Sequence, residues 1–258
     1  MFDTCINLHS EQFSSDPWSV VERGFEAGLT GMGLTGSCLE STRLAIAMAK
    51  KDPDRLCATV GLHPHSAKDW SPELLDTFEN LADEPTIRAI GECGLDHFRN
   101  LSTPKEQRTC FIAHLQLAQR LNKPLFLHQR DAFEEFISIM DSYAPDVPTL
   151  VHCFTDGLSE LTALLERGYF VGITGWIADN RRNEALLEAI PYLPLDRMLI
   201  ETDAPWLTPR NIPKFRKLKA NEPQYLQYVV EAISEATGHS TTDIIQHSTE
   251  NARQFFGW

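Results

Sequence analysis

The sequence predicts an α/β protein that folds as a single (β/α)8 TIM barrel, with residues 1–258 forming one domain. Eight short apolar runs recur along the chain, and amphipathic helical segments separate them. This alternation is typical of βα units that build a parallel sheet, and eight units in about 250 residues is the count of one barrel. An open, doubly wound sheet is the alternative. It is disfavoured because no glycine-rich phosphate-binding turn follows the first strand.

The expected strands follow one another from the N-terminus to residue 203, and each contains a short apolar run of the kind that favours a buried strand. They are Phe2 to Asn7, Gly31 to Thr35, Leu56 to His63, Ile87 to Asp96, Pro124 to His128, Thr149 to Phe154, Tyr169 to Thr174 and Arg197 to Asp203.

Start and stop signals mark the helices between these strands. Ser71-Pro72-Glu73 places a capping hydroxyl before proline, and Thr103-Pro104-Lys105-Glu106 forms a capping box with proline at the first helical position. After that box, one helix face carries the apolar residues Phe111, Leu115, Ala118 and Leu121. Further helices are expected at Leu158 to Glu166, ended by Arg167-Gly168, at Tyr225 to Ala236, and at Thr242 to Phe256.

The chain is acidic, with 23 Lys and Arg against 36 Asp and Glu and a net charge of −13. This charge argues against broad adhesion to nucleic acid or to anionic membranes, so a phosphate-bearing substrate would need a metal or a local basic surface. The composition, 42% hydrophobic and 23% charged, is that of a globular protein. It excludes a disordered or fibrous chain.

The cysteines and the N-terminus favour a cytoplasmic protein. The six cysteines are scattered with no CxxC pair, which is typical of reduced thiols. The N-terminus lacks a basic segment followed by an apolar core, and no run approaches ~18 apolar residues. We therefore expect a cytoplasmic monomer with no membrane contact.

Polar side chains concentrate where the expected strands end. His63 and His65 follow the third strand, Glu92 lies in the fourth, His128 and His152 end the next two, and Asp203 ends the eighth. In a barrel of this type the carboxyl ends of the strands form the active-site face. Imidazole and carboxylate together are ligands of Zn²⁺, Mn²⁺ or Mg²⁺ at hydrolytic sites. The sequence therefore predicts a metal-dependent hydrolase.

Some of these residues have an ordinary structural interpretation as well. A lone histidine at a strand end is more often structural, but His128 and His152 end successive apolar strands, which favours a shared ligand role. A carboxylate in a buried strand, as at Glu92, is costly unless it is paired or binds metal. Glu201 is either a supporting residue of the site or part of a structural ion pair. A cysteine nucleophile at Cys93 or Cys153 is disfavoured.

Seven segments, in order along the chain, resemble the motifs of the TatD-type metal-dependent deoxyribonucleases. They are Gly61-Leu62-His63-Pro64-His65, Gly91-Glu92-Cys93-Gly94-Leu95-Asp96, Pro124 to Asp131, His152-Cys153-Phe154, Leu199 to Pro205, Asn221-Glu222-Pro223 and Asn251-Ala252-Arg253. The resemblance covers about residues 2 to 256. It implies an amidohydrolase-superfamily barrel and a divalent-metal phosphodiesterase that acts on DNA, with 3′-5′ exonuclease activity on single-stranded DNA or RNA.

The same resemblance implies roles for individual residues. Glu92, His128 and His152 match the ligands of one metal, and Asp203 matches the carboxylate that binds a further metal or activates water. His63 matches the histidine near the scissile phosphate. Mg²⁺ is the expected cofactor, with Mn²⁺ or Zn²⁺ as substitutes in vitro.

The chain departs from the family pattern in the first strand. Most members carry a His-x-His pair there, whereas this chain has Cys5 and Asn7. His9 lies two residues further on and is not assumed to replace either. The departure leaves open whether one or two metal ions bind.

A basic segment supplies the local positive charge that an acidic nuclease needs. Five positive residues and no acidic one lie between Arg210 and Lys219, directly after the eighth strand. We expect phosphate contacts from His65, Arg130, Arg210, Arg216 and Lys217, and from Arg181-Arg182. Trp176 and Trp206 are candidates for stacking on an unpaired base, and equally for packing within their loops.

Two other functions remain compatible with the sequence. The same ligands in an amidohydrolase barrel could cleave a small amide, ester or lactone, although the basic segment favours a phosphate substrate. A non-catalytic protein with a decayed metal centre is suggested by Cys5 and Asn7. It is disfavoured by the retention of the four other site residues, Glu92, His128, His152 and Asp203. A metal-dependent nuclease with a role in DNA repair or degradation is the function that the sequence favours.

Overall fold

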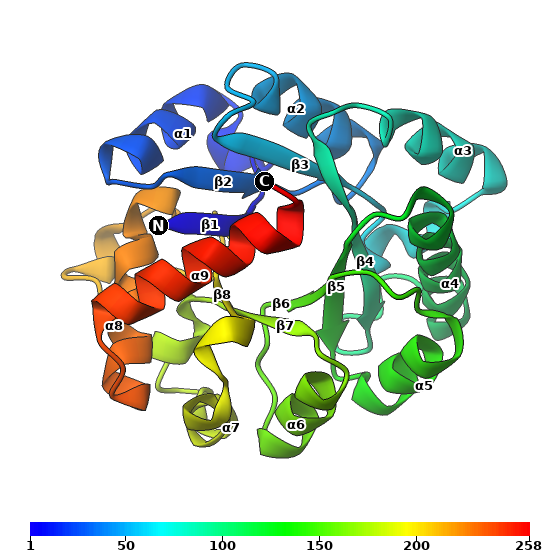
Figure 1. Ribbon diagram of the computed structural model, residues 1–258. Helices are drawn as coiled ribbons and strands as arrows, with labels where there is room; N and C mark the ends of the chain where they lie inside the picture. The colour runs from blue at the N-terminus through cyan, green and yellow to red at the C-terminus, as the bar shows by residue number, and fades with distance from the viewer. The chain divides into compact units, whose positions relative to one another are not determined.

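The computed structural model describes every residue, Met1 to Trp258, and shows strands and helices that alternate along the chain (Figure 1). The strands are β1 (Phe2–Ile6), β2 (Gly31–Leu34), β3 (Leu56–Val60), β4 (Ile87–Asp96), β5 (Leu125–Arg130), β6 (Thr149–His152), β7 (Phe170–Ile173) and β8 (Met198–Ile200). The α-helices are α1 (Pro17–Glu26), α2 (Leu39–Ala49), α3 (Pro72–Leu81), α4 (Pro104–Leu121), α5 (Phe133–Tyr143), α6 (Leu158–Glu166), α7 (Glu184–Ala189), α8 (Leu226–Thr237) and α9 (Thr241–Phe256).

All eight strands belong to one sheet, and their order in the sheet is their order in the chain. Neighbouring strands run parallel, as in the pairs β4 with β5 and β5 with β6. The chain just after β8 returns to the first strand through a parallel bridge between Ile6 and Ala204. A parallel sheet of this order that comes back to its first strand is a (β/α)8 barrel. The fold class expected from the sequence is confirmed.

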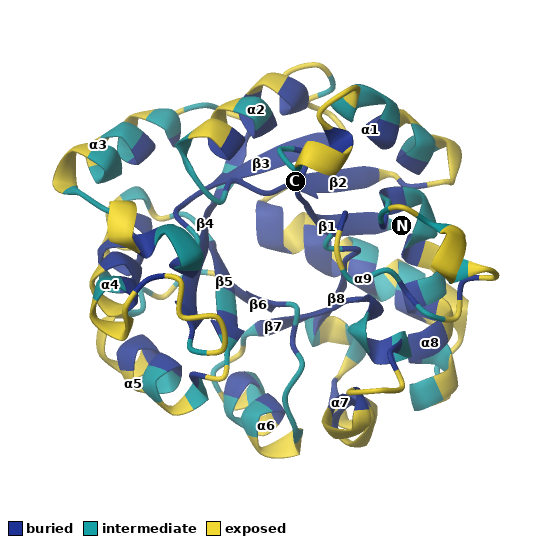
Figure 2. Cartoon of the chain, turned by 180° about the vertical axis from the view of Figure 1, so that it is seen from behind, coloured by how far each residue is buried: buried dark blue, intermediate teal, exposed yellow.

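The chain forms two compact units. The first unit, residues 1–34 and 153–258, holds β1, β2, β7 and β8, and the second unit, residues 35–152, holds β3 to β6. In both units the strands are buried, and the helices turn one face inward and the other to solvent (Figure 2). None of the helices combines the length and the apolar character that crossing a bilayer requires.

The helix start signals act as the sequence predicts. The Ser71 hydroxyl accepts a hydrogen bond from the N–H of Leu74 at the start of α3. At the start of α4, Thr103 and Glu106 exchange the two hydrogen bonds of a capping box. On the apolar face of α4, Phe111, Leu115 and Ala118 are fully buried.

Strands β3 and β8 are shorter than expected. They end at Val60 and Ile200, so the prediction that they reach His63 and Asp203 is wrong. Proline at position 64 begins the 3₁₀ helix η2 (Pro64–Asp69), which turns the chain at His63. Asp203 has a left-handed backbone, with φ +53°, which ends the extended run after β8. Both side chains therefore stand on loops just beyond their strands.

Candidate metal centre

Three histidines of the second unit converge on one carboxylate oxygen, Oε1 of Glu92. His63 Nε2 lies 3.2 Å from it, His128 Nδ1 3.1 Å and His152 Nε2 2.8 Å. His128 Nδ1 and His152 Nε2 are 3.2 Å apart. The structure thus brings Glu92, His128 and His152 together with His63, and the sequence had singled out all four.

The register of the strands explains why these side chains converge. His128 of β5 is the direct partner of His152 of β6, so the two rings stand side by side. The pairing of β4 with β5 shifts between Ile90 and Cys93, around Glu92.

Two glycines allow the backbone of β4 to lie close to that of β5. Gly91 and Gly94 have φ of +134° and +142°, values that side-chain-bearing residues rarely adopt. A Cβ at Gly91 would come within 1.9 Å of the carbonyl oxygen of Phe126, and one at Gly94 within 1.9 Å of that of His128. Only glycine fits at either position, so these residues fix the irregular strand that carries Glu92.

Asp96 is a functional candidate that becomes apparent in the structure. It ends β4, is almost fully buried, and its Oδ2 lies 2.8 Å from His65 Nε2 and 3.5 Å from His128 Nε2. A carboxylate behind a metal-binding histidine is a common device for fixing the ring. The available signal was an acidic residue at the end of an apolar strand, which is the same signal that identified Asp203.

The tautomer of His63 follows from its neighbour. The backbone N–H of His65 donates to Nδ1 of His63, at 3.1 Å. The neutral ring therefore carries its proton on Nε2, the atom that faces Glu92. A histidine in this state donates a hydrogen bond through Nε2. His63 also lies in a group with Glu92 and His128 whose ligand atoms are within 4.8 Å of one another, so a metal would bind His63 Nε2 only after its proton is lost.

Burial and the neighbouring groups shift the pKa values of this cluster in opposite directions. Burial alone would raise the pKa of Glu92, but His63, His152 and His128 outweigh it and hold that pKa well below its usual range. Burial lowers the pKa of His63 to about 4, against the opposing effect of Glu92. Burial also disfavours a charged His128, yet the hydrogen bonds that it donates to Asp96 and Glu92 raise its pKa. Glu92 is therefore an ionised acceptor.

The donor set fits a divalent cation. Two ligand atoms that each lie about 2.1 Å from one metal ion are about 3.0 to 3.4 Å from each other. The distances among Glu92 Oε1, His128 Nδ1 and His152 Nε2 are 2.8 to 3.2 Å, close to this range. A buried carboxylate with imidazole nitrogens aimed at the same point is the ligand chemistry of a divalent metal.

Asp203 lies in the first unit, where residues of β1 and its extension hold it. The side-chain amide of Asn7 donates to its Oδ1 at 2.9 Å, and Cys5 Sγ lies 3.5 Å from the same oxygen. The backbone N–H of Asp203 donates to the carbonyl of Cys5. Cys5 and Asn7 therefore face the same side, as the alternation of a strand requires.

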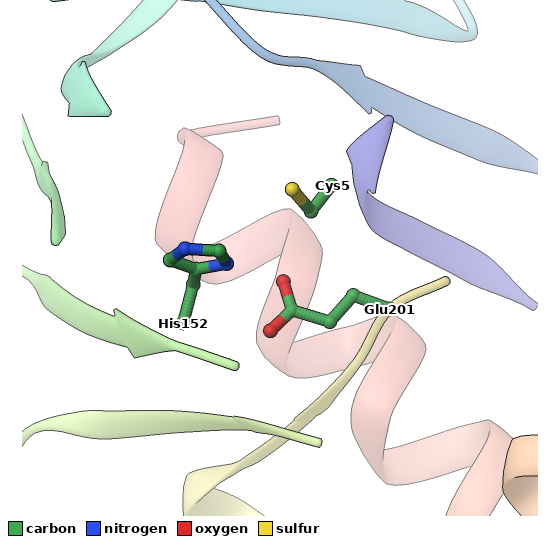
Figure 3. A group of neighbouring side chains, drawn as sticks. All are labelled: Cys5, His152 and Glu201. Atoms are coloured by element: carbon green, nitrogen blue, oxygen red, sulfur yellow. The ribbon is translucent and has the colours of Figure 1, made fainter. Parts of the chain in front are cut away.

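Behind Asp203, two buried acids join β1 to the chain after β8. Glu201, drawn with Cys5 in Figure 3, accepts hydrogen bonds from the backbone N–H of Cys153 and the hydroxyl of Thr4. Asp3 accepts from the backbone N–H and the hydroxyl of Thr202, at 2.9 and 2.6 Å. Burial raises the pKa of Asp3 to about 8. These contacts identify Glu201 as a residue that supports the loop of Asp203.

The expected phosphate-binding residues lie at several places. Arg130 stacks on Phe98, with Cζ 4.0 Å from the ring centre, and Arg210 lies 4.6 Å from the ring centre of Phe215. Arg216 and Lys217 are exposed in the 3₁₀ helix η6 (Phe215–Lys217). Arg182 stacks on Trp176, whereas Trp206 is 46% exposed.

A model of the family described as TatD related DNase matches residues 2–257. The chain belongs to this family. It is 43% identical over 257 residues to the 3′-5′ ssDNA/RNA exonuclease TatD of Erwinia tasmaniensis, covering 99% of both chains. It is 42% identical to the protein of that name from Salmonella typhimurium, over 99% of this chain and 98% of the relative.

The family fold extends to solved structures. A TatD homologue from Escherichia coli K12 superposes with a TM-score of 0.91 at 24% identity, covering 100% of this chain and 98% of that one. This likeness supports the barrel fold independently of the strand pairing.

Proposed function

We propose that this protein is a divalent-metal-dependent nuclease that removes nucleotides from the 3′ end of single-stranded DNA or RNA. Membership of the TatD related DNase family makes it a hydrolase that acts on nucleic acid. The observation that carries the proposal is the meeting of His128 and His152 at one oxygen of Glu92, in a chain whose relatives are named 3′-5′ ssDNA/RNA exonuclease over their whole length.

In this proposal Glu92, His128 and His152 hold one cation, and Asp203 is a further ligand or acts on the attacking water. We propose Mg²⁺ as the native ion because carboxylate oxygens suit it, and we expect the imidazole nitrogens to allow Mn²⁺ or Zn²⁺ in vitro. A bound divalent ion supplies positive charge that stabilises the phosphate oxygens in the transition state.

The remaining roles belong to side chains of the chain itself. His63 donates from Nε2 to an oxygen of the scissile phosphate, since its Nδ1 already accepts from His65. Asp203 accepts the proton of the attacking water, while Asn7 holds its other oxygen in place. His65, Arg130, Arg210, Arg216 and Lys217 bind the phosphates of the strand.

We also propose that residues 1–258 act as one catalytic domain, as a monomer, in the cytoplasm, and in DNA repair or degradation. The single family match from residue 2 to residue 257 supports the one domain. The scattered cysteines favour a reducing compartment.

Product ladders from single strands labelled at either the 3′ or the 5′ end test the proposal. With Mg²⁺, we expect successive shortening from the 3′ end, and loss of activity when the metal is chelated. A panel of amides, esters and lactones run in parallel tests the amidohydrolase alternative. Turnover of an acyl substrate with intact oligonucleotides would overturn the proposal, and inactivity on both would favour the non-catalytic alternative.

A further inference from the structure

Asp179 lies at the meeting point of the loops that follow β7 and β8 in the first unit. It is only 4% exposed. Its two oxygens accept hydrogen bonds from Nε and Nη2 of Arg181, at 2.7 and 2.6 Å, and Oδ2 also accepts from Nε of Arg182 at 3.0 Å. Arg210, from the loop after β8, approaches Oδ1 to 3.7 Å. One carboxylate thus gathers three arginines from two loops.

This cluster carries more positive charge than the carboxylate can neutralise. The hydrogen bond from Arg181 lowers the pKa of Asp179 to about 2, so the carboxylate is ionised at neutral pH. Three guanidinium groups around one carboxylate leave two net positive charges. Like charges this close repel one another. The surplus positive charge can attract an anionic ligand.

Aromatic rings orient two of the three arginines. Cζ of Arg182 lies 3.6 Å from the ring centre of Trp176, and the indole N–H of Trp176 donates to the carbonyl of Arg182. Phe215 supports Arg210 in the same way, at 4.6 Å. A guanidinium stacked by its face keeps the N–H donors at its edge for a phosphate.

The exposure of these side chains leaves donors within reach of a ligand. The exposed fraction of the side chain is 62% for Arg181, 40% for Arg182 and 23% for Arg210. Each guanidinium has five N–H donors, and Asp179 engages two on Arg181 and one on Arg182. The loops also begin at the carboxyl ends of β7 and β8, the edge of the first unit from which Asp203 projects.

We propose that Asp179 organises Arg181, Arg182 and Arg210 into a binding site for the phosphodiester backbone of a single-stranded nucleic acid. This inference rests on the proposed nuclease function and adds to it a site held by a buried acid. Asp179 is a positioning residue: it touches the arginines and not the strand. Trp176 serves as the support for Arg182, rather than as a platform for a base.

The variant Asp179→Asn tests this site because its two expected effects on affinity are opposite. The change in net charge favours binding of a strand, whereas the loss of the contacts that position the arginines weakens it. Removing a negative charge brings the acidic protein closer to neutral, which by itself strengthens attraction to a polyanion. If Asp179 positions the arginines, affinity for a fluorescent single strand falls instead, by about tenfold, and the salt dependence of binding becomes flatter. The KM for the strand rises while kcat changes much less.

Asp196→Asn is the matched control. It makes the same change of charge at an acid whose side chain is 68% exposed and pairs with the adjacent Arg197. We expect its affinity to equal or slightly exceed that of the wild type. Wild-type affinity and salt dependence in Asp179→Asn would overturn the proposal.

A second variant keeps the test decisive if Asp179→Asn fails to fold. Arg181→Gln with Arg182→Gln removes two exposed cations and should weaken binding and reduce the salt slope by about 1.4, the value for two contacts with a single strand. An unchanged slope overturns the site. Binding is measured separately from cleavage, so the two proposals can fail independently. A wild-type protein that binds strands through this cluster but cleaves none would refute the nuclease proposal and support the proposed binding site.

Discussion

Glu92 illustrates at the scale of one residue how burial and charge define the site. A carboxylate only 5% exposed would normally be costly, because burial removes its hydration. Here three imidazole rings surround one of its oxygens, and two of these rings, His128 and His152, are the ones that we propose as metal ligands. The same arrangement that makes the ionised acid acceptable in the fold makes it a suitable ligand.

Replacement of a single ligand should therefore remove both metal and activity. We expect Glu92→Ala, His128→Ala and His152→Ala each to lower metal-dependent turnover by about 100-fold or more, because a three-ligand site loses both geometry and charge. Bound metal and turnover measured on the same samples check this. His247→Ala, on α9, should retain both, and near-normal turnover in any ligand variant would refute the assignment.

The first strand permits a gain-of-binding test. Asn offers only a neutral carbonyl oxygen and Cys a soft thiolate that is poorly matched to Mg²⁺, so we expect one tightly bound ion per chain. Cys5→His combined with Asn7→His should raise bound Zn²⁺ or Mn²⁺ toward two per chain, since both side chains face Asp203. Metal titration of the wild type and of the double variant measures the number of ions that each chain binds. Two equally tight sites in the wild type would contradict the expectation.

Part of the site could be predicted from the sequence because its residues end apolar strands. His128 and His152 were singled out by this pattern, and Glu92 was singled out as a carboxylate within a buried strand. Asp96 shows the same signal but was not assigned, since its partners, His65 and His128, become apparent only in three dimensions. Asp179 gave no signal, because it lies in a loop and its role depends on the path of a second loop.

At the scale of elements, β4 shows why strand alternation is an incomplete guide. The bounds of β4 agree with the expected Ile87 to Asp96, yet the register shift at Glu92 changes which residues face each side. Helix bounds were better predicted, because capping residues such as Thr103 are local signals. The ends of β3 and β8 were less well predicted. After β3 a turn that begins at Pro64 ends the extended backbone, and after β8 the left-handed backbone of Asp203 does so.

Helix α4 carries a buried histidine that should make the protein sensitive to acid. His114 accepts from the N–H of Leu62, faces the carbonyl of Cys110 at 2.8 Å, and burial lowers its pKa to about 4. Because the folded-state pKa is depressed, this contribution to stability is present above the ordinary value of 6.5 and is lost as the pH falls through 4. The difference corresponds to about 3 kcal/mol.

His114→Gln should therefore flatten the dependence of stability on pH. Glutamine has an acceptor and a donor but does not titrate, so the free energy of unfolding should fall less between about pH 7 and about pH 4 than in the wild type. Urea unfolding across this range measures the effect. His247→Gln should keep the wild-type dependence, and parallel curves for His114→Gln and wild type would show that His114 contributes nothing.

At the scale of the whole molecule, a net charge of −13 must be reconciled with an anionic substrate. The basic segment after β8 supplies exposed cations, and the Asp179 cluster lies beside it through Arg210 and Phe215. We therefore expect attraction to a nucleic acid at these loops, against the repulsion that the net negative charge produces.

Neutral replacements of Arg216, Lys217 and Lys219 should weaken oligonucleotide binding and lower its salt slope by up to about 2, or about 0.7 for each lost contact with a single strand. The chemistry of bound substrate should change little. Affinity measured over a range of salt concentrations, with single-turnover rates at saturating protein, separates the two effects. An unchanged slope would mean that the segment is only a solvated loop.

The confinement of positive charge to these loops also determines how such an enzyme would search a cell. Duplexes and folded RNAs far outnumber free strand ends, and a broadly basic nuclease would spend its time bound to them without effect. An acidic protein with a small cationic surface has fewer such contacts, because its net charge opposes nonspecific binding. The cost is a weak hold on the product, so we expect it to dissociate often between cleavages and to trim many strands a little rather than one strand completely.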